Sequence, residues 1–531
     1  MTDIPRPEGG DPPRREPVLS GFGAANARPP AVPWWKLRRA EMRGVEYPPD
    51  PSAVTSDPVR AATDGPVDPA DPADLSDLAV PTVDRSQLDL ARTPLAIAGL
   101  LVLVTVVVAH FATVPWLSRT FVAAAGILGA IGFGHWLQAR HPAEPWLARF
   151  LAWGAIVKVL ASLLRYRTLV DAYGAVGDAT IYDTWGRRFS NVWLGVSGAQ
   201  VGVLPDLRKS NFVRWFTGVV YYLFGRDIIT GFLVFGLIAL VGSYLWYRAG
   251  CIAVPFLDRR LFLILMLFAP SLAFWPSSVG KEALMQFGLG AIALGTAYVL
   301  RGRLLHGVLV AFPGAWLVWV VRAHLLGIAV LAAALAYIVG RSGRRATTEG
   351  SLFKPIGVIL VALIAVFAVS QGSKALGVDA LSFDSIQSEL EATQTSTSQG
   401  GSKFESSVSL SPLSLPMAAV TVLIRPVPWE VETPNQILAS IEGLALVAFM
   451  VYRRRSLAAS LRRVRVQPFL LYCWTLTITY VMLFQAFGNF GLLVRQRSIV
   501  LPALYLLLCL QTESAPTPEP AADAAATARP I

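Results

Sequence analysis

Apolar blocks with few charges alternate with short polar stretches from residue 94 to residue 511. The blocks follow neither the 3.6-residue period of an amphipathic helix nor the alternation of a strand, and most run for about 20 residues. About 20 residues at a rise of 1.5 Å cross the core of a bilayer. The pattern therefore predicts an all-α fold, a polytopic transmembrane helical bundle of about twelve spans. The expected spans are 94–113, 118–137, 146–164, 228–247, 261–275, 282–300, 304–321, 324–340, 354–370, 435–452, 468–487 and 498–511.

Polar segments rich in Pro and Ala flank this predicted transmembrane domain, residues 93–511. Residues 1–92 and 512–531 have too few apolar residues to bury a core, so we expect two disordered tails. The first apolar block begins far too late for a cleavable signal peptide. Arginines concentrate in alternate loops, and the positive-inside rule then predicts a multi-pass protein of the plasma (inner) membrane with both termini in the cytoplasm.

Two connections are long, 165–227 and 371–434, and both fall on the outer face in this topology. Loops beyond about 15 residues are usually functional or disordered. Each contains one apolar run, 212–224 and 413–424, that is too short to cross and is typical of a re-entrant or interfacial segment.

Composition narrows the class of protein further. Hydrophobic residues make up 54% of the chain and charged residues 15%, against about 25% charge in soluble proteins. The net charge of +11 comes largely from loop arginines, so it reflects topology, and no nucleic-acid partner is expected. The three cysteines, Cys251, Cys473 and Cys509, show no paired spacing and indicate neither a metal motif nor a disulfide framework.

Five polar clusters near the outer membrane surface could carry chemistry. In the first, Asp178 and Tyr182 lie four residues apart, as do Asp183 and Arg187, so each pair would share a helix face. One carboxylate could then act as a general base while the other is tied to arginine. The alternative is an N-terminal capping Asp followed by a loop salt bridge.

The second and third clusters lie where expected spans begin or end. Lys281 and Glu282 start a helix after two serines, which suits a phosphate at the helix N-terminus; the alternative is a lysine that snorkels to the interface. Arg322 and His324 fall in a very short connection between two spans, where an interfacial arginine is the plainer interpretation.

The fourth cluster comprises Arg425, Trp429 and Glu430, stiffened by two prolines, and it suits a phosphate or a sugar; an interfacial anchor is the alternative. Thr433 and Gln436 form a capping box for the span that follows. Glu442 lies two turns inside that span, where a carboxylate needs a partner or a function.

The fifth cluster, Arg495 and Arg497, breaks the positive-inside trend at the edge of the last span. Two guanidiniums suit a diphosphate or phosphate; pairing with acidic residues of the long outer loops is the alternative. The tryptophans of the outer segments, which could stack on sugars, are Trp185, Trp193, Trp215 and Trp429. Cations for phosphate, a carboxylate base and aromatic faces together are what a lipid-phosphate sugar transferase needs.

The motif Gly177-Asp178-Ala179 with Tyr182, and the apolar run 212–250 broken at Gly225-Arg226-Asp227, resemble the GT-C superfamily of membrane glycosyltransferases. The resemblance implies a polyprenyl-phosphate-linked sugar as donor and Asp178 as the catalytic or acceptor-activating acid. The later clusters resemble actinobacterial cell-envelope proteins associated with polysaccharide synthesis. Two features depart from the superfamily: the acidic loop follows the third expected span, and no second acid adjoins Asp178, so a divalent metal cofactor is left open.

The leading hypothesis is transfer of the sugar to a glycan, lipid or protein acceptor of the cell envelope, at the extracytoplasmic face of the bilayer. A polymerase or ligase acting on polyprenyl-diphosphate glycans is the nearest rival, because Arg495 and Arg497 suit a diphosphate. A flippase is a rival of another class, against which stand the lack of visible repeats and the few charges at mid-bilayer depth. Nothing specific favours a non-catalytic scaffold.

Overall fold

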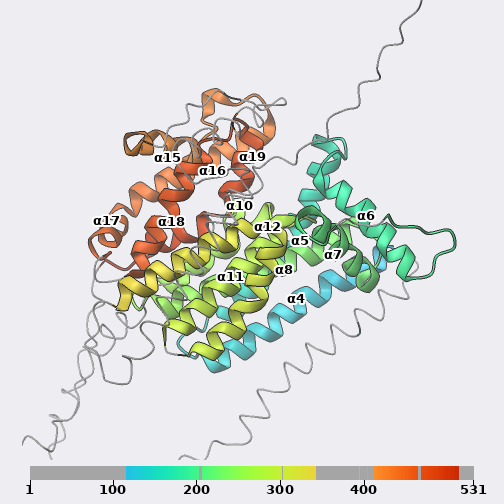
Figure 1. Cartoon of the computed structure of the whole chain (residues 1–531), viewed down its shortest axis with the longest axis horizontal. Coiled ribbons are helices and arrows are strands. Elements are labelled where there is room, and N and C mark those ends of the chain that lie inside the picture. Colours follow the sequence, from blue (N-terminus) through green and yellow to red (C-terminus); the bar gives the residue numbers. More distant parts are fainter. Residues whose placement is uncertain are drawn as a thin grey trace, which may run out of the picture.

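The computed structural model describes residues 115–202, 206–301, 303–341, 411–464 and 468–512, together with the single residues 104, 394 and 404. Helices account for nearly all regular structure in these ranges, and no strand occurs in them (Figure 1). The expected all-α fold is therefore confirmed for this part of the chain. Both predicted tails up to residue 92 and beyond residue 512, the spans 94–113 and 354–370, and most of loop 371–434 lie outside the ranges.

Five helices are long and apolar enough to cross a membrane, and they indicate a membrane protein. They are α4 (Pro115–Arg140), α5 (Leu147–Arg167) with its π-helical extension η2 (Thr168–Ala172), α8 (Ile228–Ala253), α11 (Lys281–Leu300) and the first part of α12 (Leu304–Arg341). Counting two bent helix pairs raises the number in the described ranges to seven. The expected count of about twelve spans is thus met only in part.

Four expected spans have a different form in the structure. Pro270 divides 261–275 into α9 (Arg259–Phe268) and α10 (Pro270–Phe274), because proline has no N–H to continue the helix. The spans 304–321 and 324–340 run together as α12, kinked where Arg322 takes the non-helical angles φ −152° and ψ 73°. The span 498–511 is replaced by α19 (Phe490–Arg497) and α20 (Leu501–Leu508), which meet at a bend of 54°.

Close packing at glycines joins the central helices. A Cβ on Gly295 of α11 would come within 2.4 Å of the Gly307 carbonyl oxygen in α12, and one on Gly290 within 2.6 Å of the Gly242 carbonyl in α8. Small residues let helix backbones approach this closely inside a membrane. The three helices therefore form a tightly packed centre.

The long connection 165–227 folds as a helical hairpin that projects from the bundle (Figure 1). It contains α6 (Asp178–Trp193) and α7 (Lys209–Phe224), which pack against each other where a Cβ on Gly186 would lie 2.6 Å from Thr217. The short apolar run 212–224 thus forms most of α7 and covers α6. The hairpin ends at Gly225, whose φ of 97° favours glycine.

The C-terminal helices (orange and red in Figure 1) complete the bundle. They are α15 (Leu415–Leu423), α16 (Pro434–Tyr452), α17 (Arg454–Arg462), α18 (Pro468–Phe484), α19 and α20. Arg453 donates to the Leu508 carbonyl at 2.8 Å, and the Asp258 amide donates to the Cys509 carbonyl at 2.7 Å. These contacts bring the arginine-rich start of α17 to the bundle end where α8 stops and α9 begins.

Candidate functional site

Four charged side chains from separate helices meet at the opposite end of the bundle. Asp178 begins α6, Glu282 is the second residue of α11, Arg322 lies at the kink of α12, and Arg495 is in the last turn of α19. The Nε and Nη2 atoms of Arg495 lie 2.8 and 2.9 Å from the carboxylate oxygens of Glu282. Its Nη1 lies 3.5 Å from the carboxylate of Asp178. Arg322 Nη2 lies 3.6 Å from Glu282. We call these four residues the Glu282 cluster.

Burial differs sharply within the Glu282 cluster. The side chains of Glu282 and Arg322 are each 3% exposed, whereas that of Asp178 is 57% exposed. The Nε and Nη1 atoms of Arg322 are buried without a hydrogen-bond partner. A buried acid therefore lies at the centre of the cluster, an exposed carboxylate lies at its rim, and the unpaired guanidinium donors of Arg322 lie beside them.

Tyr182 lies one turn after Asp178 on α6 and is 3% exposed. Burial raises the pKa of its hydroxyl, and the nearby Asp178 carboxylate raises it further. Tyr182 therefore stays protonated at any physiological pH. The predicted shared face of Asp178 and Tyr182 is present on α6, and it places a hydroxyl donor next to the cluster.

Arg165, in the last turn of α5, is a further cation at this site that the sequence analysis did not single out. Its guanidinium carbon lies 4.9 Å from the ring centroid of Trp275 and 5.3 Å from that of Phe274. Its Nε and Nη1 are buried without a hydrogen-bond partner, and it is close enough to Glu282 and Arg495 to interact with both charges. Basic residues are common at the end of a span, so the sequence held no distinguishing signal.

The aromatic contacts of Arg165 compensate its burial only in part. A cation–π contact contributes about 0.5–2 kcal/mol. Removing a charged group from water costs several kcal/mol even after relaxation. No carboxylate in the described ranges lies within ion-pair distance of Arg165, so its positive charge is left largely unbalanced.

Asp183 is held on the other side of α6. Its carboxylate accepts from Arg187 Nε at 2.9 Å and from the Tyr221 hydroxyl at 2.5 Å. The predicted contact between Asp183 and Arg187 is confirmed within α6, and the hydrogen bond from Tyr221 joins α6 to α7. Of the two candidate acids, Asp178 alone belongs to the Glu282 cluster.

Arg495 and Arg497 have different partners. The Arg497 side chain is 1% exposed, and its Nη2 lies 3.0 Å from Glu442 while Nη1 donates to the Leu423 carbonyl at 2.9 Å. Glu442 also accepts from the Ser271 amide at 2.8 Å, at the start of α10. The expected partner of Glu442 is thus Arg497, and the two arginines do not form a pair of their own.

The short helix α10 carries opposite charges at its two ends. Glu442 binds at its start, and Lys158 Nζ from α5 donates to the Leu272 carbonyl at 2.7 Å, near its end. An anion at the N-terminus and a cation at the C-terminus both favour the helix dipole. These contacts fix α10, which leads directly into Trp275 and then into α11.

The remaining candidates lie apart from the Glu282 cluster or add little to it. Arg425 pairs with Glu430 in its own turn and stacks on Phe404 at 4.3 Å. Burial alone would raise the pKa of Glu430, but hydrogen bonds from Arg425 and a backbone amide outweigh it and lower the pKa. Trp429 is 84% exposed. Lys281 is buried beside Glu282, and His324 lies within α12, two residues beyond the kink rather than in a connection between spans.

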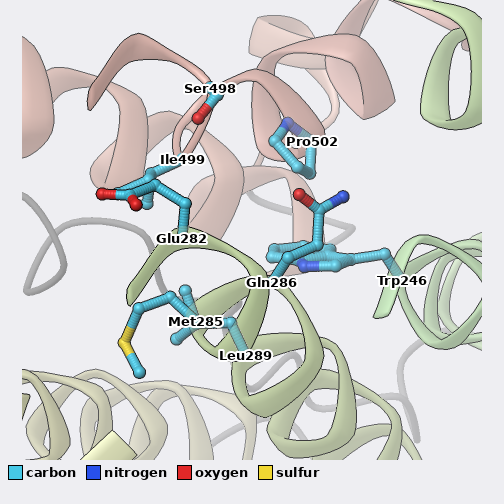
Figure 2. Close-up of a pocket in the computed structure, with 8 residues that line it drawn as sticks. All are labelled: Trp246, Glu282, Met285, Gln286, Leu289, Ser498, Ile499 and Pro502. Atoms are coloured by element: carbon cyan, nitrogen blue, oxygen red, sulfur yellow. The ribbon is translucent and has the colours of Figure 1, made fainter. Parts of the chain in front are cut away.

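A small pocket lies beside Glu282 (Figure 2). The volume that the centre of a water molecule can occupy in this pocket is about 10 Å³, which is room for about one water. Figure 2 shows residues of α11 facing the bend between α19 and α20. The lining residues are Trp246, Glu282, Met285, Gln286, Leu289, Ser498, Ile499 and Pro502. The cluster therefore borders a mainly apolar space.

The arrangement suits anion binding better than metal binding. Within the described part of the chain, no three His, Cys, Asp or Glu side chains come together as a ligand set. Guanidinium N–H groups, in contrast, are the preferred donors to phosphate. Chemically, the site offers donors for a phosphate, an accessible carboxylate base and a neutral phenol. The chain matches no known family model, no curated protein and no solved structure.

Proposed function

We propose that this protein is a membrane glycosyltransferase that moves a sugar from a polyprenyl-phosphate donor to a hydroxyl group of a cell-envelope acceptor. One observation carries the proposal: the exposed carboxylate of Asp178 lies 3.5 Å from Arg495, whose other edge is fixed by buried Glu282. A transferase of this class needs a base for the acceptor hydroxyl beside cations for the departing phosphate. The Glu282 cluster combines the two.

In the proposed step, the acceptor oxygen forms a bond to the anomeric carbon of the sugar while the bond from that carbon to the phosphate oxygen breaks. The electron pair of the broken bond stays on the phosphate, whose charge grows from −1 to −2. Asp178 takes the proton of the acceptor hydroxyl. Arg495 and Arg322 stabilise the growing charge, because their positions are fixed before the reaction. Attack opposite the leaving group inverts the anomeric centre.

The distribution of arginines supports an extracytoplasmic site. The bundle end opposite the Glu282 cluster has short connections, and arginines lie in them or in the helix turns beside them: Arg248, Arg259, Arg260, Arg301 and the arginines of α17. Short arginine-rich connections mark the cytoplasmic side. We therefore place the Glu282 cluster outside and retain about twelve spans with both termini inside.

The rival reaction, polymerisation or ligation of polyprenyl-diphosphate glycans, was favoured by a pair of arginines. Arg497 is instead buried against Glu442, and only Arg495 faces Asp178. We therefore rank transfer from a monophosphate donor above it, and lipid-linked glycan export stays the alternative of another class.

The direct test is transfer of a labelled sugar from polyprenyl-phosphate donors by the purified full chain in membrane vesicles. Asp178→Asn should lower the rate by about 100-fold or more, since general bases contribute 10²–10⁴-fold. Its thermal unfolding should stay that of the wild type, because Asp178 is exposed and makes only one long contact. Asp171→Asn, at an exposed acid of η2, is the matched control and should keep full activity. Full activity in Asp178→Asn, or no transfer by the wild type from any such donor, would refute the proposal.

A further inference from the structure

Arg165 combines an aromatic surround with buried donors that have no acceptor. The guanidinium is enclosed by the rings of Tyr173, Phe274 and Trp275, at 5.9, 5.3 and 4.9 Å from the ring centroids. Two of its nitrogen atoms, Nε and Nη1, are buried without an acceptor. The rings hold the group in place but provide no acceptor for these two donors.

The charge around Arg165 points to an anion. The Glu282 cluster is neutral by itself, with two carboxylates and two guanidiniums, and Arg165 adds one positive charge. Arg322, which lies 3.6 Å from Glu282, also has two buried donors without a partner. Buried charges in proteins are almost always balanced by a partner. An anion between these guanidiniums would balance the charge and satisfy the unused donors of both.

We infer that Arg165, together with Arg322 and Arg495, binds the phosphate of the substrate, and that Arg165 is a catalytic residue in its own right. The inference rests on the proposed function for the identity of that substrate, a lipid phosphate. Guanidiniums on several sides of a phosphate stabilise it most when its charge grows as the sugar leaves. Arg165 should therefore affect kcat more than KM in the transfer reaction.

Binding of farnesyl phosphate to the purified full chain in detergent tests the inference without the transfer reaction. Arg165→Gln should weaken binding by about 10-fold or more, the effect of one charge-assisted hydrogen bond, and leave binding of uncharged farnesol unchanged. Arg165→Lys should lie between, because lysine keeps the charge but not the planar fork. Arg167→Gln, at an exposed arginine of the same helix, should bind as the wild type does. Binding of inorganic phosphate to the wild type shows whether the site takes a lipid phosphate or a free phosphate. If inorganic phosphate binds more weakly than farnesyl phosphate, the prenyl chain takes part in binding.

Unfolding without ligand separates binding from a structural role. An arginine that serves the ligand leaves an unbalanced charge in the empty protein, so Arg165→Gln should unfold at the same temperature or a higher one. Unchanged farnesyl phosphate affinity in Arg165→Gln, or a lower unfolding temperature together with unchanged affinity in Arg165→Lys, would overturn the inference. If the wild type binds farnesyl phosphate through Arg165 but transfers no sugar, the proposed function and the catalytic role of Arg165 fail, and only its phosphate-binding role stands. If transfer is seen and Arg165→Gln alters neither binding nor kcat, the inference alone fails.

Discussion

Replacing Glu282 with Gln removes the negative charge that holds two arginines in the centre of the cluster. The glutamine has nearly the same size, so packing should stay intact while the charge is lost. Arg495 loses its two contacts of 2.8 and 2.9 Å to a carboxylate, and Arg322 loses its contact at 3.6 Å. The net charge of the Glu282 cluster with Arg165 rises from +1 to +2, and the lost charge is at its buried centre, where the side chains of Glu282 and Arg322 are each 3% exposed.

The magnitude follows from the burial of the Glu282 side chain, which is 3% exposed. Breaking a buried ion pair by removing one partner costs about 3–5 kcal/mol, because the other charge is left uncompensated. We expect Glu282→Gln to lower the free energy of unfolding by about this amount. Glu430→Gln is the matched control: its carboxylate is 19% exposed and pairs with Arg425 within one turn, so about 1 kcal/mol is expected.

Unfolding of the purified chain by denaturant in mixed micelles measures both values. A double-mutant cycle with Arg495→Gln then isolates the pair, and we expect a coupling energy of about 2 kcal/mol or more. An unfolding free energy of Glu282→Gln within about 1 kcal/mol of the wild type would refute the reasoning. Strict additivity of the two replacements would refute it as well, since it would mean that the contacts between Glu282 and Arg495 contribute nothing.

Three further predictions concern the surrounding fold. Gly295→Val should destabilise the protein by about 1–3 kcal/mol, because its Cβ would lie 2.4 Å from a carbonyl of α12, whereas Gly132→Val, with nothing within 4 Å, should have little effect on the unfolding temperature. Arg497→Met should lower the free energy of unfolding by about 3–5 kcal/mol, because the charge of Glu442 is left without its partner. The same replacement should cost less in a Glu442→Gln background. Burial alone would raise the pKa of Asp227, but hydrogen bonds from an arginine and a threonine outweigh it and lower the pKa below 3.8. The stabilising effect of the Asp227 carboxylate is therefore full above pH 3.8 and is lost as the pH falls through the folded pKa. In Asp227→Asn, the unfolding temperature should depend less on pH over that interval than it does in the wild type.

The sequence predicted those features that depend on local pattern. Hydropathy located α8 and α11 to within a few residues, because a long apolar block has few alternatives to a membrane-crossing helix. The capping box was also predicted: Gln436 Oε1 accepts from the Thr433 amide at 3.0 Å at the start of α16. Spacing alone was enough for the contact between Asp183 and Arg187.

Features that depend on contacts between distant segments could not be read from the sequence. Arg495 and Arg497 are two residues apart, and only the packing of α19 decides that one faces Glu282 and the other Glu442. Arg165 looked like any basic residue at the end of a span, since two of its three aromatic neighbours, Phe274 and Trp275, come more than 100 residues later. The break of α9 and α10 at Pro270 was visible in the sequence but was absorbed into a single expected span.

The helix dipoles favour four of these charges at the helix ends where they lie. Asp178 and Glu282 lie in the first turns of α6 and α11, whereas Arg165 and Arg495 lie in the last turns of α5 and α19. Each charge therefore has the sign that its helix end favours, by about 0.3–1 kcal/mol. Acids already occupy the helix N-termini at this site, where phosphates often bind. An anion must then be held by the guanidiniums at the C-terminal ends, and its affinity should depend on individual arginines.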